Sequence, residues 1–184
     1  MKQLQEELYT WAQTLTTFHL PRWQELPDLE LYMDQVIKLV DNYLSPVIQT
    51  EKHPLLTAAM VNNYVKKKII PPPVKKKYNR KHLAFLIAIT SLKQVLAIEE
   101  IRTGILFQGK KIGIRQAYDV FCETQEQAIQ LIGLQIQGEF STSMTDIPLE
   151  LIAVTAAARS FAGKLLAEKM IELEKVYLTK VATT

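Results

Sequence analysis

The sequence has little cysteine and no long apolar run, and both absences limit the kinds of protein that it can encode. The single cysteine, Cys122, excludes a disulfide framework and fits a reducing cytoplasm. The opening residues, MKQLQEELYTW, lack the apolar core of a signal peptide. The most apolar stretch, 149–167, is interrupted by Glu150, Arg159 and Lys164, whereas a membrane helix needs roughly 18–20 apolar residues in a row. We therefore expect a cytoplasmic protein with no membrane partner.

Glycine is also scarce, and the patterns typical of enzymes are missing. Six glycines in 184 residues favour helices over β-hairpins. No nucleophile–base pair or carboxylate pair stands out, and the residues GKK at 109–111 lack the rest of a phosphate-binding P-loop. His19, His53 and His82 are scattered, with no second ligand at metal spacing. Cys122 is interpreted as a buried thiol, with a redox sensor as the alternative. The sequence predicts no enzymatic activity, no cofactor and no metal site.

Acidic residues are absent from a long central segment. Between Lys52 and Ile98 there is no Asp or Glu, and the same window carries ten basic residues. Because the whole chain has a net charge of only +3, the rest of the chain is net acidic. A single lysine triplet is usually a solvated face, but two triplets, Lys66–Lys68 and Lys75–Lys77, flank one proline-rich turn. This charge separation predicts a polyanionic partner.

Apolar periodicity predicts helices over most of the chain. The expected helices span residues 6–17, 31–47, 58–67, 81–96, 98–108, 114–137 and 149–181. Pro71–Pro73 cannot be helical and favour an extended path, after which VKKKY suits a short charged edge strand, or wing. We expect a mainly all-α fold in three parts. These are an N-terminal helix with a proline-bounded loop (1–28), a winged helix-turn-helix (29–108) and a C-terminal helical region (109–184).

Residues 60–72 resemble the MerR family of bacterial transcription regulators. The segment reads MVNNYVKKKIIPP where the family pattern is TLRYYEREGLLPP, so Tyr64 and Lys66 stand at its second tyrosine and second arginine. Residues 76–78 (KKY) replace Arg-x-Tyr of the family's wing, and 98–102 (IEEIR) resemble its Leu-Glu-Glu-Ile-Arg. Lys68 departs from the pattern, because the family has a glycine there that closes the recognition helix. The resemblance implies a MerR-like winged helix-turn-helix.

Two further sequence runs resemble a second, uncharacterised family. LYMDQV at 31–36 and NNYVKKK at 62–68 are similar to runs in an uncharacterised family of small bacterial proteins that carry this MerR-like domain. That family is a domain of unknown function, so the likeness implies the fold and leaves the activity open.

The residues expected to contact DNA divide by their chemistry. Cations neutralise phosphates, while hydroxyls and the N-terminus of helix 58–67 donate to them. Asn62 and Asn63 are the expected base readers, since asparagine pairs bidentately with adenine. An alternative makes Tyr64 a core residue and leaves the asparagines in solvent without a role. The full predicted set is Thr57, Asn62, Asn63, Tyr64, Lys66, Lys67, Lys75, Lys76, Lys77, Tyr78, Arg80 and Lys81.

These features lead to one expected function and one alternative. The first is a transcriptional regulator that docks double-stranded DNA through the helix 57–67 and the basic wing 71–81. The alternative is a protein-interaction module with a winged-helix fold that binds an acidic protein partner. Single-stranded nucleic acid is less favoured, because no aromatic ladder lies beside the lysines. The resemblance implies a homodimer formed through 109–184, although that region also suits a bundle that binds a small-molecule effector, or plain monomer packing.

Overall fold

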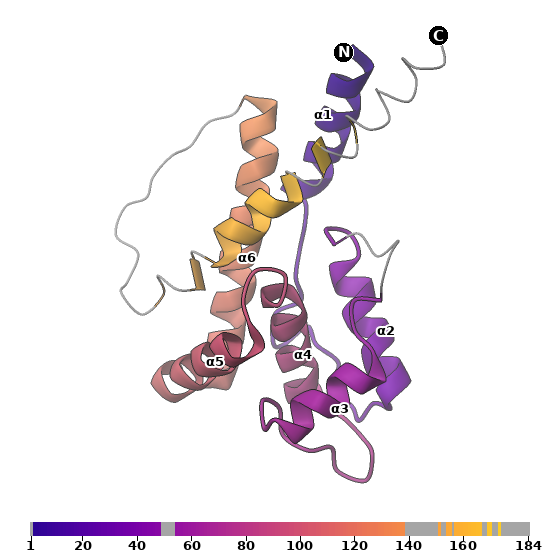
Figure 1. The fold of residues 1–184 in the computed structure, drawn as a ribbon, viewed down its shortest axis with the longest axis vertical. Helices are drawn as coiled ribbons and strands as arrows, with labels where there is room; N and C mark the ends of the chain where they lie inside the picture. The colour runs from indigo at the N-terminus through magenta and orange to yellow at the C-terminus, as the bar shows by residue number, and fades with distance from the viewer. Residues whose placement is uncertain are drawn as a thin grey trace. The chain divides into compact units, whose positions relative to one another are not determined.

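The described part of the chain is helical. The computed structural model describes residues 2–48, 54–138, 151, 154–155, 157–166, 169–170 and 173. These residues form helices and, apart from isolated bridges, no β-strand, which confirms the prediction of an all-α fold (Figure 1). The labelled helices are α1 (Lys2–Thr16), α2 (Met33–Leu44), α3 (Ala58–Lys66), α4 (Arg80–Leu92), α5 (Ile98–Ile112) and α6 (Ile114–Gln137).

The chain divides into two compact units. One unit is Leu20–Glu123, and the other combines Met1–His19 with Thr124–Thr184. Within the first unit, α5 continues through residues 109–111 and ends at Ile112. The break before α6 falls at Gly113, which has a φ of 82°. Glycine adopts this conformation at little cost because it has no Cβ. Predicted helix 149–181 lies partly outside the described residues, but 154–155 and 157–166 are helical.

Helix α4 forms the centre of the Leu20–Glu123 unit. Its run LAFLIAIT is apolar nearly all round, and Leu83, Leu86, Ile87 and Ile89 are fully buried. Burying a side chain of this size stabilises a fold by roughly 1.5–3 kcal/mol. Helix α4 packs against α2 and α5, and α2 packs against α3. In Figure 1, α3 crosses the lower ends of α2 and α4. No helix in the described ranges is both long and apolar enough to traverse a bilayer.

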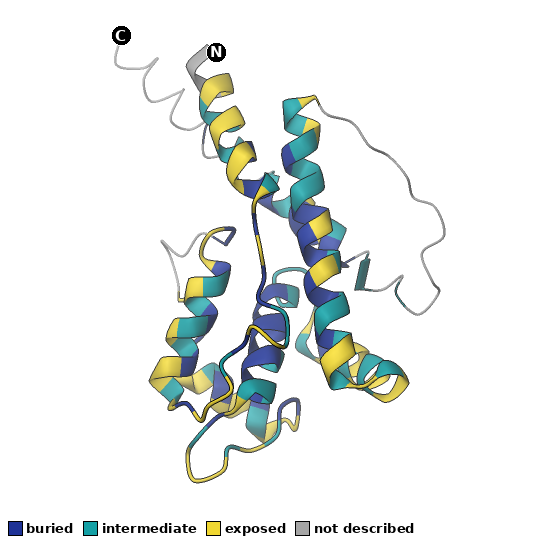
Figure 2. Ribbon diagram, turned by 180° about the vertical axis from the view of Figure 1, so that it is seen from behind, coloured by how far each residue is buried: buried dark blue, intermediate teal, exposed yellow. Residues whose placement is uncertain are grey.

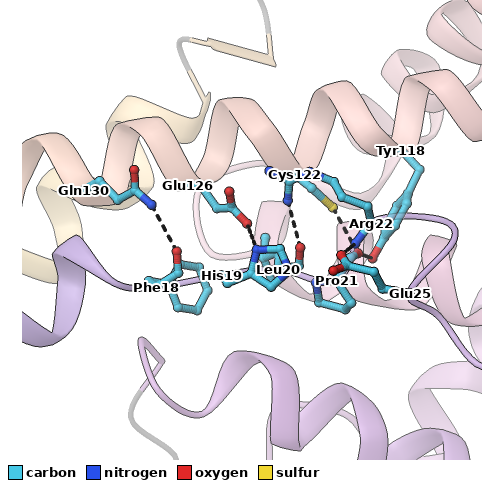
Figure 3. Close-up of polar contacts among 10 residues, drawn as sticks. All are labelled: Phe18, His19, Leu20, Pro21, Arg22, Glu25, Tyr118, Cys122, Glu126 and Gln130. Atoms are coloured by element: carbon cyan, nitrogen blue, oxygen red, sulfur yellow. Dashed lines mark hydrogen bonds and ion pairs between the residues drawn. The ribbon is translucent and has the colours of Figure 1, made fainter.

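The segment that precedes α2 is held by hydrogen bonds within the same unit. The Tyr118 hydroxyl donates to the Pro21 carbonyl at 2.9 Å, and the Cys122 Sγ lies 3.7 Å from the same oxygen (Figure 3). Burial is the main cause that raises the pKa of Tyr118 well above its usual range. Cys122 is fully buried, as predicted for an inert thiol. The Trp23 amide donates to Asp119 at 2.6 Å.

The other unit contains a close approach of α1 and α6. A Cβ added to Gly133 of α6 would lie 2.7 Å from the carbonyl oxygen of Ala12 in α1. In the same unit, the Gln130 amide donates to the Phe18 carbonyl at 3.1 Å (Figure 3). His19 Nδ1 lies 3.0 Å from a Glu126 oxygen. Because glycine has no side chain, Gly133 allows α6 to lie close to α1, and any larger residue at this position would push the two helices apart.

Candidate nucleic-acid interface

Helix α3 presents a small, polar face to solvent. Thr57 caps it, because its hydroxyl accepts the amide of Met60 at 3.2 Å; this confirms the predicted N-cap. Val61 and Tyr64 are buried. The exposed residues follow a helical spacing and include no acid: Ala58, Ala59, Asn62, Asn63 and Lys66. In Figure 2 the loop between α3 and α4, at the bottom of the view, is coloured mainly as exposed or intermediate. The two alanines leave room for close approach by a partner.

Helix α3 ends through a left-handed lysine. Lys68 has a φ of 55°, and the amide of Ile69 donates back to the Tyr64 carbonyl at 2.9 Å. Glycine is the usual residue at such an exit, and a lysine costs about 1 kcal/mol more there. Helix α3 therefore ends through the left-handed residue that usually closes a helix, with a lysine at the position where the family pattern has a glycine. The Lys68 side chain is exposed, although the sequence did not place it among the contact residues.

The wing is a tight two-residue turn and not the expected strand. Val74 and Lys77 exchange both backbone hydrogen bonds, at 3.1 and 2.9 Å. The two residues between them, Lys75 and Lys76, have φ values of 49° and 64°. Positive φ at both central positions defines the type I′ family of turns, which favours Asn-Gly. Two lysines thus occupy positions where their backbone is strained and their side chains reach solvent.

The base of this turn is anchored to the segment before α2. Leu31 and Tyr78 exchange backbone hydrogen bonds at 2.7 and 2.8 Å. Tyr78 is only 3% exposed, and its ring packs edge-on to His82 at 5.3 Å between centroids. Burial raises the pKa of Tyr78. Tyr64 is likewise 3% exposed, so both tyrosines are core side chains and we leave them out of the proposed contacts.

The segment 52–98 contains no acidic residue, but the fold places acidic residues from other parts of the chain beside three of its cations. Lys67 Nζ lies 3.4 Å from Glu99 of α5, and Lys77 Nζ lies 3.2 Å from Glu30. Arg80 Nη2 lies 3.6 Å from Asp28. Arg80 also donates from Nε to the Leu26 carbonyl at 3.0 Å, so its guanidinium holds the loop before α2. The predicted cations therefore separate into those with an acidic neighbour and those without.

We call five of the predicted cations, together with Lys68, the lysine surface: Lys66, Lys67, Lys68, Lys75, Lys76 and Lys77. Four of them, Lys66, Lys68, Lys75 and Lys76, form no ion pair with any described residue. Lys81 is half-buried in the first turn of α4, with its Nζ 5.9 Å from the centre of the Phe85 ring. The lysine surface and the exposed face of α3 adjoin in the chain and share Lys66. They are the best candidate for a binding site in the Leu20–Glu123 unit.

His82 is a buried histidine in the first turn of α4. It is 3% exposed, and its Nδ1 accepts the amide of Asn79 at 3.1 Å, while Asn79 in turn caps α4. Burial lowers the pKa of His82, which outweighs the opposite influence of the Pro72 and Pro71 carbonyls. Lys81 adds to the lowering by charge repulsion. The folded state therefore favours the neutral ring.

This arrangement predicts a loss of stability in acid. Since the folded pKa of His82 lies below its unfolded value near 6.5, the unfolded chain binds the proton more readily. Its stabilising contribution is present above about pH 6.5 and falls as the pH drops through the folded pKa, by at most about 1.4 kcal/mol per pH unit. We expect urea unfolding at pH 5 and pH 7 to differ less in His82→Gln, which keeps a capping side chain. An unchanged difference would contradict this assignment.

The sequence of this protein matches a known protein family over α2 to α5. The chain belongs to the family described as domain of unknown function DUF1836, which matches residues 21–121, more than half of the chain. The match includes α2 to α5, and with them the lysine surface. No curated protein matches the chain, and no solved structure does.

Proposed function

We propose that this protein binds double-stranded DNA through the exposed face of α3 and the lysine surface, as a transcriptional regulator with a MerR-like winged helix-turn-helix. One observation carries the proposal: Lys68, Lys75 and Lys76 are all held at positive φ. Each of these positions favours glycine or asparagine, so each lysine adds strain of about 1 kcal/mol. Their side chains are exposed and form no ion pair with described residues. What each side chain adds at these positions is a positive charge directed at solvent.

The chemistry of α3 supports duplex DNA as the polyanion. Phosphates supply the attraction for lysines, but base edges in the major groove are read by side chains of a helix that enters the groove. Asn62 and Asn63 offer amides that pair with adenine, and Ala58 and Ala59 offer methyl groups for contact with thymine. No acidic residue lies on this face to repel the backbone. The exposed face of α3 thus offers side chains for base contacts, and the adjoining lysines offer cations for phosphate contacts, as a DNA-recognition helix requires.

The connection between α2 and α3 is longer than in compact helix-turn-helix proteins. Thirteen residues, 45–57, separate the two helices, where a turn of about 3–4 residues is usual. Leu56 is buried just before the Thr57 cap, so the approach to α3 is fixed by packing. The proposal therefore rests on the presented surface and on the sequence resemblance, without requiring a short turn.

A second candidate is favoured by exposed apolar residues near the wing. Leu29, Tyr32 and Val74 are 56%, 55% and 65% exposed. Val74 begins the turn that carries Lys75 and Lys76, and Lys77 Nζ lies 5.9 Å from the centre of the Tyr32 ring. A mixed apolar and basic surface also suits an acidic protein segment. In that case the protein is an interaction module with no affinity for duplex DNA.

Titration of labelled duplex DNA at several salt concentrations tests the proposal. If five or six phosphates are neutralised, the slope of log K against log salt is roughly −5. The informative variant is Lys75→Asn/Lys76→Gly, which provides the preferred turn sequence and removes two cations. We expect its melting temperature to rise by about 4–8 °C, because two strained lysines together cost about 2 kcal/mol and each kcal/mol shifts the melting temperature of a protein of this size by about 2–4 °C. Its DNA affinity should fall.

The outcomes separate the two candidates. No binding by the wild-type protein at about 50 mM salt would overturn the DNA proposal. Recovery of an acidic protein that survives nuclease treatment, together with absent duplex binding, would support the interaction module. If Lys75→Asn/Lys76→Gly gains stability and keeps full DNA affinity, the strained lysines do not contact DNA and the carrying observation fails.

A further inference from the structure

The two exposed asparagines of α3 do not occupy equivalent positions on the helix. Successive residues of an α-helix are rotated by about 100° around its axis. At this spacing, the exposed residues of α3 fill an arc about 140° wide, with Ala58 at one edge and Asn63 at the other. Asn62 lies about 30° from the middle of this arc, and the buried Tyr64 lies almost directly opposite the middle. A surface that approaches α3 therefore faces Asn62 and meets Asn63 only at the rim.

The amide of Asn62 is available to another molecule. The side chain is exposed and forms no hydrogen bond with any residue in the described part of the chain. Asparagine favours helix caps and turns, where its amide bonds to the backbone, and inside a helix it is a weaker helix former than alanine. The fold of the described residues therefore makes no use of this amide, which presents both donors and an acceptor to solvent.

The neighbours of Asn62 near the middle of the arc are Ala59, one turn earlier, and Lys66, one turn later. The asparagine side chain is short, so it reaches a base edge only where the helix backbone comes close, and the small Ala59 allows this approach. An asparagine amide matches adenine, because its oxygen accepts from N6 and its nitrogen donates to N7. Guanine is most often read by arginine, and α3 contains none. The middle of the arc therefore suits A·T base pairs.

We infer that Asn62 reads one adenine in the major groove and that Asn63 reads no base. The inference rests on the proposed function and adds the sequence class of the DNA, which is a site with A·T pairs beneath α3. Ala59 lies three residues before Asn62, about 4.5 Å along the helix axis, which is close to the base-pair step of about 3.4 Å. Its methyl group therefore contacts the methyl group of a thymine in the next base pair. Lys66 and the other lysines bind phosphates and carry no sequence information.

Selection from a randomised DNA duplex library with the purified full chain identifies a preferred site. Each adenine of that site is then replaced singly by 7-deazaadenine, which keeps the Watson–Crick pairing and the charge but lacks the N7 acceptor. We expect one adenine at which this replacement lowers the wild-type affinity about tenfold. Asn62→Ala should lower the affinity for the unmodified site about tenfold or more, and 7-deazaadenine at that position should then have no further effect.

Two controls separate base reading from other effects. Asn63→Ala makes the same side-chain change at the rim of the arc and should leave both the affinity and the adenine preference unchanged. Asn62→Ala removes no charge, so its slope of log K against log salt should match that of the wild type. Alanine is the better helix former, so the Asn62→Ala variant should fold, and circular dichroism checks this.

The inference is wrong if 7-deazaadenine has no effect at any position of the preferred site, or if that site contains no adenine. It is also wrong if Asn63→Ala, and not Asn62→Ala, removes the adenine preference. In each of these cases the wild-type protein still binds duplex DNA, so the proposed function stands. Absence of duplex binding by the wild-type protein would instead overturn the proposed function, and the inference with it.

Discussion

Replacing Lys75 and Lys76 with glutamine is expected to reduce the salt dependence of DNA binding by an amount that corresponds to two phosphate contacts. Each phosphate contact contributes about 0.9 to the slope of log K against log salt, so the slope should change from roughly −5 to roughly −3. At about 0.1 M salt, the affinity should fall roughly fiftyfold. Lys66→Gln/Lys68→Gln removes the same charge at the end of α3 and should have a similar effect. The four changes together should nearly abolish binding.

The control removes two lysines outside the candidate interface. Lys38 lies on α2 and Lys110 on α5, and both are exposed in the same compact unit. Lys38→Gln/Lys110→Gln therefore changes the net charge by the same amount as either test pair. We expect its slope to match that of the wild type. If the control pair lowers the slope as much as the test pairs, attraction comes from the overall charge and the lysine surface is not the binding site.

Gly133→Ala is expected to destabilise the protein, although the same change usually stabilises a helix. The new methyl group would lie 2.7 Å from the Ala12 carbonyl oxygen, 2.9 Å from Thr16 Cγ2 and 3.2 Å from Leu15 Cβ. Backbone and β-branched atoms yield little, so α1 and α6 must separate, at a cost of about 1–3 kcal/mol. Thermal and urea unfolding measure the change.

Gly163→Ala is the matched control in the same compact unit. Gly163 is exposed within a helical stretch, and an added Cβ would meet no described atom within 4 Å. Here the change should stabilise the protein by about 0.5–1 kcal/mol through helix propensity alone. The two glycine variants should thus have opposite signs. A stabilising effect at Gly133 would mean that α1 does not pack against α6 at this point.

Features encoded over a few residues were predictable from the sequence. The cap at Thr57, the apolar period of α2 and the continuous apolar run of α4 each depend on neighbours within one or two turns, and helices form where they were expected. Helix ends were less predictable, because they depend on how the next segment packs. Thus α2 ends at Leu44 and not at Val47, which is buried in the loop that follows.

Features that depend on residues distant in the chain were not predictable. The absence of acids between Lys52 and Ile98 is a property of the sequence, but Asp28, Glu30 and Glu99 reach the same cations in space. Likewise, the sequence allowed Tyr64 to be either a phosphate ligand or a core residue, and only packing decides that it is buried. For Lys75 and Lys76, the positive φ follows from the closed turn between Val74 and Lys77, which their residue type disfavours.

The ion pair between Lys67 and Glu99 joins the end of α3 to the start of α5. A phosphate that binds Lys67 competes with Glu99 for the same ammonium group. Phosphate binding therefore changes the free energy of the Lys67–Glu99 ion pair, and the ion pair changes the free energy of phosphate binding. An exposed pair of this kind contributes about 0–1 kcal/mol, so the coupling amounts to a severalfold change at most. Linkage makes the effect reciprocal: whatever phosphate binding does to the contact between Lys67 and Glu99, that contact does equally to phosphate binding.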